Sequence, residues 1–132
     1  MTTPGPAAET PRPVLPWTLS PRNPMRVVLL STLLFEVLLY ALAIPVMILV
    51  SHTAALPAAF LGSAAAVVAL AGAGLLRKPL GYPIGWVAQL AGILLGILTP
   101  AMFVVGGMFT ALWVVSFVLG KRLDARSEPT TA

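Results

Sequence analysis

Residues 27–50 read VVLLSTLLFEVLLYALAIPVMILV, and this run decides the fold class. It is long enough to cross a hydrocarbon core of about 30 Å, because an α-helix rises about 1.5 Å per residue. Its only charged residue is Glu36. We expect Pro45 to kink the helix, which neighbouring helices can accommodate. The run therefore predicts a first transmembrane helix.

Three further apolar segments follow, separated by short breaks such as SHTAALP at 51–57 and Thr99-Pro100. The last of these breaks is very short, so the final two helices should form a tight hairpin. The sequence thus predicts four spans, over about 26–50, 57–76, 82–99 and 102–120.

The composition excludes a water-soluble domain. Hydrophobic residues make up 58% of the 132-residue chain and charged residues 9%, whereas typical globular proteins have roughly 25% charged residues. So few charges cannot cover a surface that faces water, and the apolar surface must face lipid. We therefore expect an all-α integral membrane bundle of four transmembrane helices.

The two ends of the chain differ from the transmembrane domain at 25–120. Residues 1–24 hold seven of the thirteen prolines, and proline lacks the amide hydrogen that a helix interior requires. We expect this segment to be a disordered cytoplasmic tail, and residues 121–132 to be a polar cytoplasmic tail. A cleaved signal peptide ending at Ala41-Leu42-Ala43 is an alternative, but its apolar region would contain Glu36 and its leader would be too long.

The basic residues predict the orientation. With four spans, all of them fall on one side of the membrane, which the positive-inside rule places in the cytoplasm. We expect a plasma (inner) membrane protein with both termini cytoplasmic. The eight basic residues are Arg12, Arg22, Arg26, Arg77, Lys78, Lys121, Arg122 and Arg126.

These charges flank the membrane in three short segments, which favours anionic lipid headgroups as partners over nucleic acid. A membrane protein partner or a homo-oligomer is a further expectation. The candidates for headgroup or partner contact are Arg22, Asn23, Arg26, Arg77, Lys78, Lys121 and Arg122.

Polar side chains inside the predicted spans are few. Glu36 lies about 15 Å from the cytoplasmic end of its helix, with Thr32 and Tyr40 one turn to either side on the same face. Gln89 and Thr110 lie at a similar depth on the third and fourth spans. A buried carboxylate costs several kcal/mol unless it is protonated, paired or hydrated. A polar layer of Glu36, Gln89 and Thr110 is therefore expected, either to hold the helices together, to relay a proton or cation, or to contact a substrate or partner.

Small residues form stripes on two spans. Gly92 and Gly96 make a GxxxG motif on the third span, and Gly62 begins a similar stripe on the second. Such residues let helices approach closely, and we expect packing within the chain more than a dimer interface. The pair Gly106-Gly107 should allow close contact or a local bend in the fourth span.

No motif points to catalysis. The chain has no cysteine, its single His52 cannot form a metal site alone, and it contains no nucleotide-binding loop or catalytic triad. The sequence therefore predicts no enzyme activity, no cofactor and no metal.

Several short segments, taken together, resemble a known family over about residues 20–126. They are Arg22-Asn23-Pro24-Met25-Arg26, Glu36, Gly85-Trp86-Val87-Ala88-Gln89, Met102–Phe109 with Trp113, and Gly120–Asp124. The combination resembles the actinobacterial integral-membrane family catalogued as domain of unknown function 4233. The resemblance implies a four-helix plasma-membrane protein without an assigned activity. It also suggests testing Arg22, Asn23, Arg26, Glu36 and Gln89.

Two functions remain open from the sequence. The first is a non-enzymatic accessory or scaffolding membrane component. The alternative is a small proton- or cation-coupled transporter or channel subunit that uses Glu36 in an oligomer. The small multidrug-resistance exporters are similar in architecture only, and the one-sided charges argue against their dual topology. An enzyme acting on lipid would lack catalytic groups.

Overall fold

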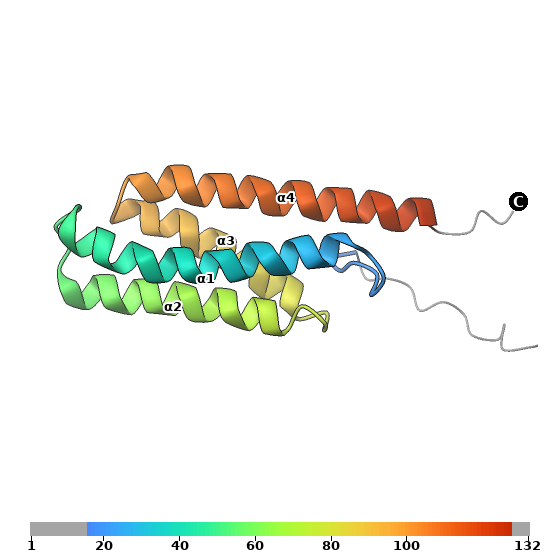
Figure 1. Ribbon diagram of the computed structural model, residues 1–132, viewed down its shortest axis with the longest axis horizontal. Helices are drawn as coiled ribbons and strands as arrows, with labels where there is room; N and C mark the ends of the chain where they lie inside the picture. Colours follow the sequence, from blue (N-terminus) through green and yellow to red (C-terminus); the bar gives the residue numbers. More distant parts are fainter. Residues whose placement is uncertain (1–15, 128–132) are drawn as a thin grey trace, which may run out of the picture.

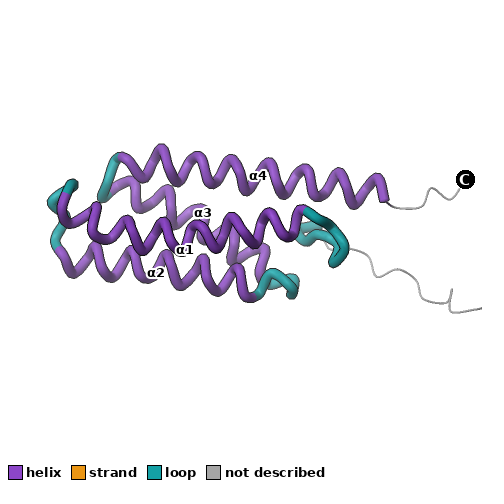
Figure 2. The backbone as a smooth tube through the Cα atoms, viewed as in Figure 1, coloured by secondary structure: helices purple, strands orange, loops and turns teal. Residues whose placement is uncertain are grey.

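Four antiparallel helices form a bundle in the computed structural model, which describes residues 16–127 (Figure 1). The elements are α1 (Met25–Leu49), α2 (Ala55–Gly74), α3 (Gly81–Leu94), the 3-10 helix η2 (Leu95–Ile97) and α4 (Ala101–Ser127). Within the described range the chain contains only helices and connecting loops (Figure 2). Each helix packs against the next one in sequence, and α1 also packs along α4, so the bundle closes on itself.

Three of the helices, α1, α2 and α4, are long and apolar enough to cross a membrane. The remaining helix is α3 together with η2, Gly81–Ile97. It is apolar but shorter, and its length is close to the lower limit of about 17 residues for a spanning helix. Large apolar side chains on the outside remain exposed, as lipid-facing residues do. The all-α bundle of membrane-spanning type that the sequence predicts is confirmed.

The chain reverses direction tightly after α1. This helix continues through Pro45 to Leu49, and the amide of Thr53 then donates to the Met47 carbonyl at 2.9 Å. His52 has a φ of 53°, in the left-handed region that ends many helices. Its side chain is exposed in this turn.

Glycines set the distance between helices α3 and α4. A Cβ placed at Gly106 would lie 2.8 Å from the backbone carbonyl carbon of Gly92. A Cβ at Gly96 would meet the ring of Phe103, and one at Gly85 would meet the ring of Trp113. The Gly92-Gly96 motif is therefore used for packing within the chain, as expected from the sequence.

The two ends of the transmembrane domain differ from the sequence prediction. Residues 16–24 form turns that pack against the bundle, so the prediction of a disordered tail is wrong for these residues; residues 1–15 lie outside the described range. Helix α4 continues to Ser127, past the predicted end of the span at 120. Folding of residues 16–24 against the last turns of α4 explains both differences, because each segment supplies hydrogen-bond partners to the other.

Candidate functional site

The polar side chains of Glu36, Tyr40 and Gln89 meet between α1 and α3, and we call them the interior cluster. Their exposed fractions are 1%, 1% and 2%. The amide nitrogen Nε2 of Gln89 donates to Oε2 of Glu36 at 2.8 Å. The cluster is therefore a buried link between α1 and α3, made by two residues that lie 53 positions apart in the sequence.

Tyr40 completes this link through the backbone of α3. Its hydroxyl donates to the carbonyl oxygen of Ala88 at 2.7 Å and lies 3.4 Å from Oε1 of Glu36. Gly92 leaves the room that this hydroxyl needs, since a Cβ there would lie 2.5 Å from it. The sequence placed Tyr40 on the face of Glu36 but gave no sign of its bond to Ala88, which depends on the position of α3.

The other two polar side chains that the sequence singled out within the spans do not join the cluster. Thr32 is buried, and its hydroxyl donates to the carbonyl of Val28 in its own helix at 2.9 Å. The hydroxyl of Thr110 is buried without a hydrogen-bond partner in the described part of the chain. The expected layer of Glu36, Gln89 and Thr110 is thus wrong for Thr110. Depth along a helix could be predicted, whereas rotation about its axis, which sets the direction of each side chain, could not.

A second polar group lies at the end of the bundle that holds the start of α1 and the end of α4 (Figure 1). Residues 16–24, which we call the collar, lie against α4 there. Asn23 donates through Nδ2 to the Gly120 carbonyl at 2.6 Å and to Oδ1 of Asp124 at 2.8 Å. Its Oδ1 accepts from the amide of Met25 at 2.9 Å, and the Ser20 amide donates to Oδ2 of Asp124 at 2.8 Å.

Apolar packing supports the collar. Leu19 is 5% exposed and lies over Gly120, where a Cβ would come within 2.6 Å of it. Asn23 is equally buried, so the prediction that it contacts headgroups or a partner is wrong. Its amide instead joins the start of α1 to the end of α4.

Arg26 also makes contacts within the chain. Its guanidinium donates to the Pro21 carbonyl at 3.0 Å and to the Leu76 carbonyl, just beyond α2, at 3.3 Å. Lys121 is partly exposed and has a contact within the structure. The remaining candidates are exposed at this same end of the bundle: Arg22, Arg77, Lys78 and Arg122.

Removing the Asn23 side chain should release the collar. In Asn23→Ala, both donors to α4 and the acceptor for Met25 are lost. We expect trypsin to cleave after Arg22 about tenfold faster in detergent-solubilised protein, the change that corresponds to a loss of about 1.4 kcal/mol of local stability. The control is Ser20→Ala, which keeps the backbone amide that donates to Asp124 and loses only the long contact, 3.4 Å, from the Arg22 amide to the Ser20 hydroxyl. Equal cleavage rates in the two variants would contradict the role of Asn23.

The comparison with protein families covers most of the chain. The model of a family described as Protein of unknown function (DUF4233) matches residues 26–129. The chain belongs to this family. The match confirms the resemblance found in the sequence and includes the interior cluster and the end of α4. No curated protein and no solved structure matched the chain.

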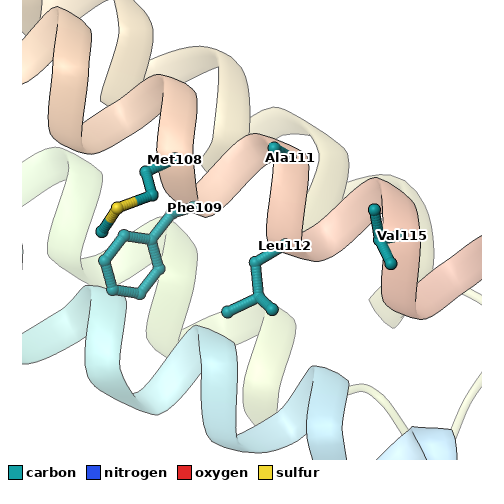
Figure 3. Close-up of a pocket in the computed structure, with 5 residues that line it drawn as sticks. All are labelled: Met108, Phe109, Ala111, Leu112 and Val115. Carbon is teal, nitrogen blue, oxygen red and sulfur yellow. The ribbon is translucent and has the colours of Figure 1, made fainter.

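The outer face of α4 in this DUF4233 protein carries a shallow hollow of about 370 Å³. The side chains that line it contain only carbon and sulfur (Figure 3). They belong to Met108, Phe109, Ala111, Leu112 and Val115. In the range 16–127 no group of three or more His, Cys, Asp or Glu residues could hold a metal ion. The hollow therefore offers a ligand apolar contact alone.

Proposed function

We propose that this protein is a non-enzymatic accessory or scaffolding component of the plasma membrane, which acts by contact with another membrane protein. One observation carries the proposal: the interior cluster of Glu36, Tyr40 and Gln89 is enclosed by the helices. A catalytic or transport site must be reached by its substrate, usually in a pocket with a few polar groups. The surface of this bundle is instead apolar along the helices and basic at one end.

The contacts of Glu36 support a structural role over the alternative of a proton- or cation-coupled transporter or channel subunit. A relay needs a sequence of groups that leads from one side of the membrane to the other. The hydrogen bonds of Glu36 lead to Gln89 and, through Tyr40, to the backbone carbonyl of Ala88. These hydrogen bonds link α1 to α3 at a single depth in the membrane, and they do not form a path from one side to the other.

We further propose that the basic end faces the cytoplasm and contacts anionic headgroups. The starts of α1 and α3 and the ends of α2 and α4 lie at this end. The opposite end, with the loops around His52 and Thr99, has no Lys or Arg. The exposed side chains of Arg22, Arg77 and Lys78 are then at the depth of the lipid phosphates.

Single cysteines test this orientation, because the natural chain contains none. A thiol introduced by Ala125→Cys should react with a membrane-impermeant maleimide only after the cytoplasmic side is opened. A thiol introduced by Ala54→Cys, in the loop between α1 and α2, should react in intact cells. The opposite pattern would reverse the proposed orientation.

Photo-crosslinking in native membranes tests the proposed partner contact. A photoreactive residue would replace one exposed residue of each helix: Leu38, Val67, Leu90 or Val115, which are 55–63% exposed. Because their exposure is matched, a difference between them reports which face meets a protein. We expect one face to give a discrete adduct with a different membrane protein, and the other faces to label lipid.

The same experiment separates the two functions. An adduct that contains only a second copy of this chain would favour the oligomeric transporter or channel subunit. Labelling of lipid alone from all four helices would contradict the accessory role.

A further inference from the structure

The hydroxyl of Tyr40 has a single proton to donate, and two oxygens lie within reach of it. The Ala88 carbonyl oxygen is 2.7 Å away, and Oε1 of Glu36 is 3.4 Å away. A carbonyl oxygen can only accept, so the shorter contact requires the proton of Tyr40. The Tyr40 oxygen therefore faces Glu36 with its lone pairs, and it can accept a hydrogen bond from that side.

An ionised Glu36 does not fit these surroundings. Its Oε2 would accept a hydrogen bond from Gln89. Its Oε1 would face the lone pairs of the Tyr40 oxygen and would lack a donor, because the Tyr40 proton is directed at Ala88. The helices around it supply no balancing charge. Helix α2 contains no ionisable residue, α3 has only Tyr82 near its start, and α4 has none before Lys121. A buried carboxylate without a cation and with one firm donor is strongly unfavourable.

We propose that Glu36 is protonated in the folded bundle and that its O–H donates a hydrogen bond to the oxygen of Tyr40. The carboxylate takes this proton from water as α1 packs against α3; one O–H bond forms, and the charge of the side chain becomes zero. Oε1–H then donates to Tyr40, Tyr40 donates to Ala88, and Gln89 donates to Oε2. In this arrangement each of these three protons faces an acceptor, and the 3.4 Å contact between Glu36 and Tyr40 is the longest of the three.

The bound proton is then a structural component of the link between α1 and α3. The link depends on Gly92, because a Cβ at this position would lie 2.5 Å from the Tyr40 hydroxyl and displace it. The inference is independent of the proposed function, since a partner contact on the outer surface requires neither protonation state.

Infrared spectroscopy detects this proton directly. In protein labelled with 13C-glutamate and reconstituted in lipid at neutral pH, we expect the carbonyl stretch of a neutral carboxyl group. The band should vanish in Glu36→Gln and persist when the other two glutamates, Glu9 and Glu128, are replaced by glutamine. Tyr40→Phe removes the oxygen that accepts the hydrogen bond from Glu36, so it should shift the frequency of the carbonyl band. Carboxylate bands alone in the wild-type protein would overturn the proposal.

Thermal unfolding at several pH values provides a second readout. The folded protein holds a proton that an unfolded, hydrated Glu36 releases, so the wild-type melting temperature should fall as pH rises. Glu36→Gln imitates the protonated acid, because its amide can donate to Tyr40 and accept from Gln89. The pH-dependent part of the melting temperature should therefore be lost in this variant. Failure of Glu36→Gln to fold, or the same pH dependence in both proteins, would overturn the proposal.

Discussion

Replacing Gly106 by alanine should strongly destabilise the bundle. The new Cβ would lie 2.8 Å from both the carbonyl carbon and the oxygen of Gly92, and 3.1 Å from the amide nitrogen of Ile93. These are backbone atoms, which cannot rotate away as a flexible side chain can. Helices α3 and α4 would have to separate, and we expect the free energy of unfolding to fall by about 2–3 kcal/mol. Tryptophan fluorescence in mild detergent would measure the change in melting temperature.

The neighbouring glycine provides a matched control. Gly107 is in the same helix, and a Cβ placed there has no neighbour within 4 Å. Both substitutions bring the same gain in helix propensity, so their difference isolates the contact with α3. Gly107→Ala should be as stable as the wild type or more stable. A similar loss of stability in both variants would show that the contact between Gly106 and Gly92 is not the cause.

Replacing Gln89 by leucine should also be costly, because it removes the amide that donates to Glu36. The Glu36 side chain, 1% exposed, would keep an oxygen without a donor. An unsatisfied buried polar group costs about 1–3 kcal/mol, and we expect the free energy of unfolding to fall by this amount. Thr32→Val is the control, since it replaces a buried hydroxyl that bonds only within α1.

A double variant sharpens this prediction. Replacing Glu36 and Gln89 together by leucine removes both partners and leaves neither of them unsatisfied. The double variant should therefore lose less stability than the sum of the two single variants, as a double-mutant cycle would measure. Simple additivity would show that the two side chains do not act as a pair.

The interior cluster shows how far the sequence could be used to predict a site. The depths of Glu36 and Gln89 follow from the number of residues between each of them and the end of its helix. Their pairing depends on the rotation of α1 and α3, which packing decides. The same uncertainty explains the wrong assignment of Thr110, which has a similar depth but no hydrogen-bond partner among the described residues.

The collar could not be predicted for a different reason. Its prolines indicate a segment that does not form a helix, and this holds for residues 16–24. They do not indicate whether such a segment is free or packed. The deciding contact joins Asn23 to Asp124, 101 residues further along the chain. Neither residue has a local pattern that points to the other, so the sequence predicts that Asn23 contacts headgroups or a partner.

The amino-acid sequence is enough to predict the class of fold, because a long apolar run with a single charge is stable as a helix that crosses lipid. It also determined that Glu36 lies deep within α1 and that the basic residues lie at one end. The tertiary structure alone decided which polar atoms meet: Gln89 and Tyr40 at Glu36, and Asn23 at Asp124. Hydropathy depends on residues that are close in sequence, whereas a hydrogen bond between helices depends on their rotation and distance. Glycines such as Gly92 and Gly106 set that distance only when they face each other.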